Sequence, residues 1–208
     1  ELSLTINAHE GNPGNVLDKP MLHRLTGQRQ GATSGSDERI EADLVTPPGA
    51  QVVWRVMRTS AYPAQAKPTV ATVYDSLREK YGPETWKELD PAGHVRHVRW
   101  VFDEQGNPLQ GATNEALARG CNIAGLNSTS FNIPAAQQGP CNQVVHLTVA
   151  IRALKVPGVA DLLEIQLVNV PLAARFFPAT DRWLQEQQGK AADRQVEQVQ
   201  QQGVKPTL

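Results

Sequence analysis

The chain lacks most of the features that would assign it a function directly. Its 208 residues contain no apolar run long enough to span a bilayer. The 20 basic and 21 acidic side chains nearly cancel, so charge gives no reason to expect nucleic acid or an anionic membrane as a partner. Hydrophobic residues make up 40% of the chain, which is enough for one substantial core.

Sequence motifs for common chemistries are also missing. The chain has no G-x-S-x-G turn, no G-x-G-x-x-G and no P-loop pattern, which disfavours nucleophilic catalysis and nucleotide binding of those kinds. It has no H-E-x-x-H motif and no Cys/His cluster. His94 and His97 are three residues apart, and in a strand such residues point to opposite faces. We therefore expect no metal site and no cofactor.

Cysteine is scarce, since Cys121 and Cys141 are the only two. The segment between them is uncharged and rich in Asn, Gly, Ser, Pro and Gln, and we predict that a disulfide closes it as a loop. The spacing is too wide for a C-x-x-C redox pair, and the alternative is two buried free thiols. A disulfide indicates a periplasmic or secreted protein. The chain begins at Glu1 rather than Met, so we expect a mature protein after signal-peptide removal or a shortened chain.

Alternation of apolar and polar residues predicts several strands. The clearest segments are residues 51–59, 95–102, 143–153 and 161–170. A further strand or short helix is expected at 38–45, and a short helix at 114–120. Strands with one apolar face are typical of an antiparallel sheet that buries that face.

Two longer helices are predicted from the spacing of apolar residues. The first follows residue 69 and ends at Gly82, a favourable capping residue placed directly before a proline. The second starts at Pro171, is interrupted near Pro178, and restarts with Thr180 as its N-cap.

The order of these elements predicts an α+β fold, an antiparallel sheet with helices packed on one face. We expect three regions along the chain. Residues 1–36 form a loop-rich, irregular N-terminal arm, in which 2–6 can add an edge strand, and residues 37–188 form a single α+β domain. Residues 189–208 form a glutamine-rich C-terminal tail with too few apolar residues to bury one face, so we expect a frayed helix or a disordered segment there.

The strand alternation also places polar side chains together on the sheet face opposite the core. The residues expected on that face are Arg55, His97, Arg99, His146, Arg152 and Glu164. Such a face can bind an anionic group or a partner protein, and its histidines would make binding pH-dependent near neutrality. The alternative is an ordinary solvated face, whose charged pairs serve solubility and local stability.

These features favour a non-catalytic extracytoplasmic binding protein. Its surface would be the polar sheet face together with the loop closed by Cys121 and Cys141, and its partner another protein or an anionic component of the cell envelope. A second hypothesis is a small secreted hydrolase, with His97 or His146 as general base and Glu164 or Asp103 as the orienting carboxylate. A third is a structural part of an envelope assembly, attached through the N-terminal arm and the C-terminal tail.

Overall fold

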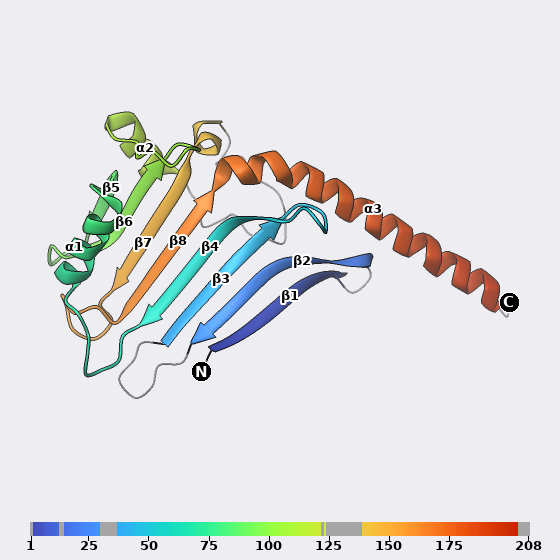
Figure 1. Ribbon diagram of the computed structural model, residues 1–208, viewed down its shortest axis with the longest axis horizontal. Coiled ribbons are helices and arrows are strands. Elements are labelled where there is room, and N and C mark those ends of the chain that lie inside the picture. Colours follow the sequence, from blue (N-terminus) through green and yellow to red (C-terminus); the bar gives the residue numbers. More distant parts are fainter. Residues whose placement is uncertain (1, 13–14, 30–36, 122, 124–138, 204–208) are drawn as a thin grey trace.

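A computed structural model shows an eight-stranded antiparallel sheet with helices on both faces (Figure 1). The structure describes residues 2–12, 15–29, 37–121, 123 and 139–203. The strands lie in the order β1-β2-β3-β4-β8-β7-β6-β5. They span β1 (Leu2–Asn12), β2 (Asn15–Arg29), β3 (Asp37–Val45), β4 (Val52–Ala61), β5 (Trp86–Leu89), β6 (Val95–Phe102), β7 (Val145–Arg152) and β8 (Leu162–Asn169). The helices are α1 (Val70–Tyr81), α2 (Ala112–Gly120) and α3 (Val170–Gln202), with a 3-10 turn at Gly139–Gln143.

The predicted α+β class with an antiparallel sheet is confirmed. The four strands expected from alternation correspond to β4, β6, β7 and β8, which are neighbours in the sheet. Their register aligns the apolar positions, because Leu147 pairs with Trp100 on one side and with Leu167 on the other. Leu167 in turn pairs with Val56 of β4. One apolar row thus crosses four strands.

Helix α1 forms as its sequence predicts and covers part of this apolar face. The Thr69 hydroxyl accepts from the N–H of Thr72 at 3.1 Å, which caps the first turn. Gly82, at φ 78°, ends the helix with its N–H bonded to the carbonyl of Arg78. The buried face of α1 packs on β6, β7 and β8. The side chains in this core include Val70, Val73, Leu77, Val98, Trp100, Leu147, Val149, Ile151 and Leu163.

The other two helices lie on the opposite face, so the helices are not confined to one side as expected. Val168 neighbours Leu167 in β8 and therefore points the other way. It belongs to a separate core with Phe177 of α3. Similarly, Val101 packs with Ala118 of α2 on this second face. The central strands therefore bury apolar side chains on both faces of the sheet.

Trp54 also lies on this second face, although simple alternation places it with Val56. The β3–β4 pairing shifts register between Asp43 and Leu44, which is the effect of a β-bulge in β4. The bulge turns the indole toward α3, where it meets the edge of Phe177 at a centroid distance of 5.1 Å. Trp54 is almost fully buried there.

The N-terminal region differs from the loop-rich arm expected at residues 1–36. Residues 2–12 and 15–29 form strands that extend the sheet beyond β3, while 30–36 lie outside the described part. Local composition indicated loops because Gly, Asn and Pro are frequent here. Met21 and Leu17, however, are buried in the core under α3. This long-range contact holds β2 in the sheet, and a local reading of composition misses it.

Helix α3 does not break at Pro178, which lies inside one continuous helix. Thr180 therefore does not cap a new helix. Its hydroxyl donates to the carbonyl of Phe176 at 3.0 Å and accepts from the N–H of Thr46 at 2.9 Å. The hydroxyl thus fixes α3 to the end of β3 while the helix passes the proline.

The glutamine-rich segment is helical up to Gln202, where a frayed helix or disordered tail was expected from residue 189. In this stretch Arg194 pairs with Asp18 of β2, and α3 lies along that strand. Residues 192–201 are nevertheless exposed, so this ion pair alone does not account for the helical conformation of the segment. None of the helices in the described ranges combines the length and apolar character needed to cross a membrane.

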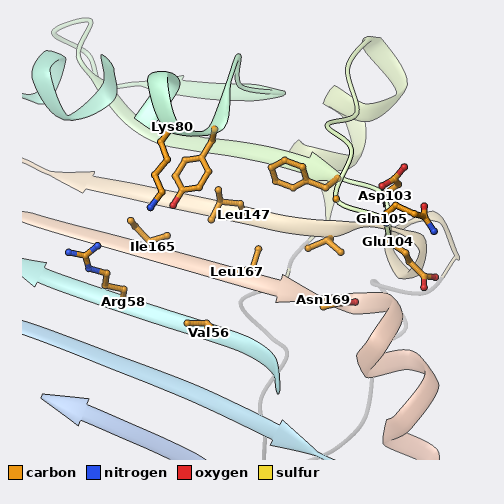
Figure 2. Close-up of a pocket in the computed structure, with 14 residues that line it drawn as sticks. Val56, Arg58, Lys80, Asp103, Glu104, Gln105, Leu147, Ile165, Leu167 and Asn169 are labelled. Atoms are coloured by element: carbon orange, nitrogen blue, oxygen red, sulfur yellow. Dashed lines mark hydrogen bonds between the residues drawn. The ribbon is translucent and has the colours of Figure 1, made fainter. Parts of the chain in front are cut away.

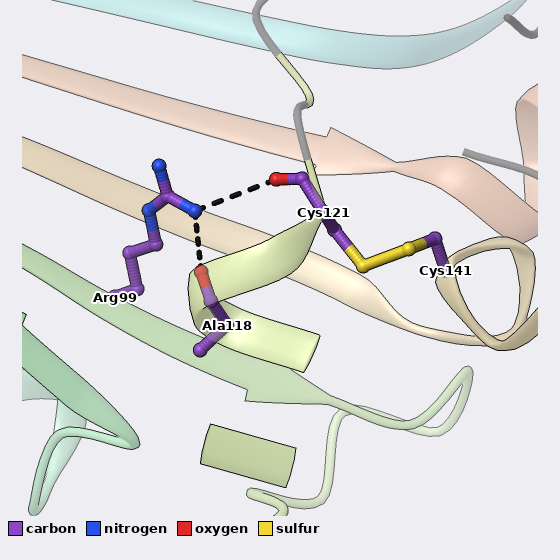
Figure 3. Close-up of a disulfide and its surroundings, with 4 residues drawn as sticks. All are labelled: Arg99, Ala118, Cys121 and Cys141. Carbon is purple, nitrogen blue, oxygen red and sulfur yellow. Dashed lines mark hydrogen bonds between the residues drawn. A yellow bond between two sulfur atoms is a disulfide. The ribbon is translucent and has the colours of Figure 1, made fainter. Parts of the chain in front are cut away.

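The predicted disulfide between Cys121 and Cys141 is confirmed, with a Cα–Cα distance of 5.8 Å (Figure 3). It joins the end of α2 to the 3-10 turn that precedes β7. Arg99 of β6 reaches the same place, where its guanidinium donates to the carbonyl of Ala118 and, at 3.4 Å, to that of Cys121. The role of the enclosed loop as a contact surface stays a prediction, because 122 and 124–138 lie outside the described residues.

Candidate functional site

The six polar residues singled out in the sequence do share one sheet face. In the register, Arg55 pairs with Val168 and Val168 with His146. One row further on, Arg99 pairs with Thr148, and the next row aligns His97, Ala150 and Glu164. Arg152 continues the same side of β7. The alternation thus assigned the face correctly, although this is the face that α2 and α3 partly cover.

Most of these residues are engaged in separate pairs. Arg55 Nε donates to Oδ2 of Asp43 at 2.5 Å, and Oδ1 of the same carboxylate accepts from Arg24 Nε at 2.6 Å. Asp43 is therefore a buried bridge between two arginines, and its side chain is only 1% exposed. Strands β2, β3 and β4 are linked through this carboxylate.

Three further residues of this face, His97, Arg152 and Glu164, form pairs with near neighbours. His97 Nδ1 lies 2.8 Å from Oε2 of Glu88 in β5, and Arg152 Nε donates to Oε2 of Glu164 at 2.5 Å. His97 and Glu164 therefore have different partners. The six residues share a face without converging on one point, and a binding role for them stays a prediction.

His146 is the residue of this face with the most unusual environment. It is fully buried, and neither ring nitrogen has a hydrogen-bond partner in the described part of the chain. Burial, together with the positive charge of Arg99, lowers the pKa of His146 to about 4. The imidazole is therefore neutral at neutral pH. A general base, or a surface group that responds to pH near neutrality, has to be accessible to solvent, and His146 is not.

The carboxylates considered for a hydrolytic site are used elsewhere. Glu164 pairs with Arg152, as above. Oδ1 of Asp103 accepts from the backbone N–H groups of Gln105 and Asn107 at 2.9 and 2.8 Å, which stabilises the turn after β6. His94 Nδ1 lies 3.4 Å from Asp90 at the start of β6. The described residues contain no group of three or more potential metal ligands.

A large hollow lies on the other face, beside the end of α1 (Figure 2). Its volume is about 610 Å³. Helix α1 covers the sheet from β6 to part of β8, but β4 and the far half of β8 extend beyond it, and the hollow lies where this cover ends. The floor is formed by apolar side chains from three strands, namely Val56, Val145, Leu147, Ile165 and Leu167. We call this hollow the groove.

Two aromatic rings form walls of the groove. Tyr81 is the last residue of α1, and its ring lies 5.6 Å from that of Trp100 beneath it. The Trp100 indole N–H donates to the carbonyl of Gly82 at 3.0 Å, which fixes the helix end above the sheet. Phe102, the last residue of β6, lines the groove as well. The cap of α1 thus determines where the wall stands.

The two ends of the groove differ in charge. Lys80 and Arg58 lie at one end, and Asp103, Glu104 and Gln105 at the other (Figure 2). A second hollow of about 360 Å³ adjoins the basic end and shares Arg58, Lys80, Tyr81 and Ile165 with the groove. Its remaining lining includes the hydroxyl side chains of Tyr62, Thr72 and Ser76.

The apolar surface continues past the groove toward the N-terminal strands. Val56 pairs with Ala42, Ala42 with Leu25, and Leu25 with Ile6. Ile6 and Ile40 are 65% and 45% exposed, and Leu167 in the groove floor is 40% exposed. A contiguous exposed apolar surface of this kind is characteristic of a binding site.

Sequence reasoning missed the groove because its floor residues read as ordinary core. Leu147, Ile165 and Leu167 have the alternation of buried strand positions. The sequence did contain one signal, which is that few helices are predicted to cover the sheet. Only one amphipathic helix is predicted between the strand at 51–59 and the three strands at 95–102, 143–153 and 161–170. Which strands that helix would leave uncovered depends on tertiary structure.

Comparison with known proteins adds no functional information. The chain matches no protein-family model, no curated protein and no solved structure.

Proposed function

We propose that this protein is a non-catalytic, extracytoplasmic binding protein, and that it holds a single-chain amphiphile in the groove. The observation that supports this most strongly is the hollow of about 610 Å³ with an apolar floor at the open side of the sheet. Pockets that bind small molecules commonly enclose about 300–1,000 Å³ and have mainly apolar linings with a few polar groups. The groove has this composition.

The dimensions of the groove favour an extended chain over a compact ligand. Its floor follows β8 from Ile165 to Asn169, roughly 13 Å at the usual rise of a strand. Apolar residues from β4 and β7 flank this line on both sides. A hydrocarbon chain lying along β8 would remove apolar surface from water on both sides of the chain.

The groove lining supports binding without catalysis. Its described residues include no histidine, serine, threonine or cysteine. Of its two carboxylates, Asp103 holds the turn after β6, and Glu104 pairs with Arg175 of α3 at 2.9 Å. The proposed extracytoplasmic location rests on the disulfide between Cys121 and Cys141, because such bonds persist in oxidising compartments.

The direct test is calorimetric titration with saturated carboxylates of increasing chain length, below their micelle concentrations. Each added methylene that is buried contributes about 0.8 kcal/mol, so the affinity is expected to rise about fourfold per carbon until the groove is full. Replacing a groove residue, Leu167→Gln, is expected to weaken binding about fivefold, because a half-exposed floor side chain becomes polar.

Leu154→Gln is the matched control, since Leu154 is 70% exposed and lies in the β7–β8 connection away from the groove. It is expected to bind like the unmodified protein. Absence of binding by every chain length, or equal weakening by both substitutions, would contradict the proposal.

A further inference from the structure

We propose that the groove selects an anionic amphiphile, with the head group between Lys80 and Arg58 and the chain directed toward Phe102 and Val145. This inference rests on the function proposed above and specifies its ligand class. It follows from an imbalance between the two ends of the groove. Both ends bear charged residues, but the carboxylates of the acidic end already accept hydrogen bonds or form an ion pair, whereas Lys80 at the basic end has no carboxylate partner among the described ion pairs.

At the basic end, the cations outnumber the carboxylates. Arg58 pairs with Glu38, and the same carboxylate also accepts from Arg29 at 2.6 Å. Lys80 has no carboxylate partner among the described ion pairs, and its ammonium lies 5.1 Å from the centre of the Tyr81 ring. Arg58 and Arg29 therefore share the Glu38 carboxylate, and Lys80 adds a further positive charge. The described residues that line the groove and the adjoining hollow include no carboxylate at this end.

The adjoining hollow also offers a neutral donor, the Tyr62 hydroxyl, to an anionic oxygen. Tyr62 is half-buried, and burial raises the pKa of its hydroxyl, so the group keeps its proton and can donate. Thr72 and Ser76 line the same hollow, but the Ser76 hydroxyl donates to the carbonyl of Thr72 at 3.0 Å. The Thr72 hydroxyl is itself hydrogen-bonded to that of Thr69 at 2.9 Å, so Tyr62 is the donor that these contacts leave for a ligand. A carboxylate or phosphate head group would thus find both charge and hydrogen bonds here.

At the acidic end, the carboxylates are already satisfied. Oδ2 of Asp103 accepts from the side-chain amide of Asn107 at 2.8 Å, in addition to the backbone donors of its turn. These hydrogen bonds lower the pKa of Asp103 and occupy its oxygens. Glu104 is neutralised by Arg175. A cationic head group would have to compete with these contacts, so the end near Phe102 is suited to the chain terminus.

Lys80 is the residue expected to determine head-group specificity. Its long aliphatic stem can lie along the Tyr81 wall while the ammonium stays at the mouth, as lysine side chains do at apolar surfaces. Because Lys80 is exposed, its contribution to the binding free energy of the head group should be that of a partly screened charge pair. This contribution should weaken as the salt concentration is raised.

The experiment compares dodecanoate, dodecanol and dodecylammonium by calorimetry at neutral pH and low salt. We expect dodecanoate to bind about tenfold more tightly than dodecanol, and dodecylammonium to bind most weakly. Lys80→Met should reduce the ratio of dodecanoate affinity to dodecanol affinity about fivefold. Lys80→Glu should reverse the order of the two charged ligands.

Lys190→Met is the matched control, because Lys190 is an exposed residue of α3 and its loss changes the net charge equally. It should leave all three affinities unchanged. Equal affinity for the three ligands, or equal effects of Lys80→Met and Lys190→Met, would overturn the head-group assignment while leaving chain binding intact. If none of the three ligands binds, the proposed function itself fails.

Discussion

The two faces of the sheet are built by the same strands but are completed in different ways. On the face under α2 and α3, charged side chains pair with one another within the sheet, as Asp43 does with Arg24 and Arg55. On the face under α1, apolar side chains cross the strands in continuous rows, and the helix covers only some of them. The first face is closed by its own pairs. The second retains apolar surface that a ligand can cover, which is why we propose it as the binding face.

The largest expected effect comes from breaking the polar face at Asp43. Asp43→Ala removes the carboxylate that bridges two arginines in a buried position, and we expect the free energy of unfolding to fall by about 3–5 kcal/mol. Urea unfolding at neutral pH measures this. Glu164→Ala is the control, since its pair with Arg152 is exposed and should contribute less than about 1 kcal/mol. Similar losses in both variants would show that the closure of this face does not depend on the buried bridge.

A somewhat smaller effect is expected from the buried histidine as pH falls. Its pKa is lowered from 6.5 to about 4 in the folded protein, so between those values the unfolded chain binds the additional proton. Stability is therefore retained above pH 6.5 and lost as the pH falls toward 4, by about 3 kcal/mol. His146→Leu should remove this part of the acid sensitivity. The measurement is urea unfolding at a series of pH values.

His94→Leu provides the comparison for that series, because His94 is partly exposed beside Asp90. This variant also loses one histidine, so it separates the effect of the buried position from that of losing a histidine. An unchanged pH profile in His146→Leu would mean that His146 is accessible to protons in the native state, and that the polar face is less closed than its geometry indicates.

The smallest expected effect is a difference in stability between two variants of the apolar face, one at a position that α1 covers and one at a position that it leaves uncovered. Leu163 and Leu167 lie on the same side of β8, but Leu163 is 9% exposed under α1 and Leu167 is 40% exposed in the groove. Leu163→Ala should destabilise by about 3 kcal/mol and Leu167→Ala by about 1 kcal/mol. Thermal unfolding of the two variants measures the difference. Equal losses would indicate that the groove floor is as well packed as the core and has no room for a ligand.

Local signals in the sequence predict the central part of this fold. The helix at Val70–Tyr81 has a threonine cap, a regular apolar stripe and a terminating glycine, and each of these acts within a few residues. The four central strands have alternating side chains, and their faces follow from the period of two. The same alternation was sufficient to group Arg55, His146 and Glu164 on one face.

Elements that depend on distant partners could not be predicted in this way. β2 contains Pro20 and Gly27, yet it is held by Met21 in the α3 core. The polar end of α3 continues a helix whose first half, through Leu184, is packed in the core. The groove is the same kind of case, because its residues look like core residues and only the position of α1 leaves them accessible. Sequence patterns specify which face a side chain occupies, whereas coverage of that face is a tertiary property.

The disulfide has a consequence for how the molecule would respond to proteolysis. A single cleavage anywhere between Cys121 and Cys141 would divide the chain into two fragments that stay covalently joined. The C-terminal fragment contributes β7 and β8, which lie between β4 and β6 of the N-terminal fragment. Separated from each other, both fragments would expose unpaired strand edges. The bond therefore keeps the two fragments at a high effective concentration, so that a nicked molecule can restore its interleaved sheet as a single particle.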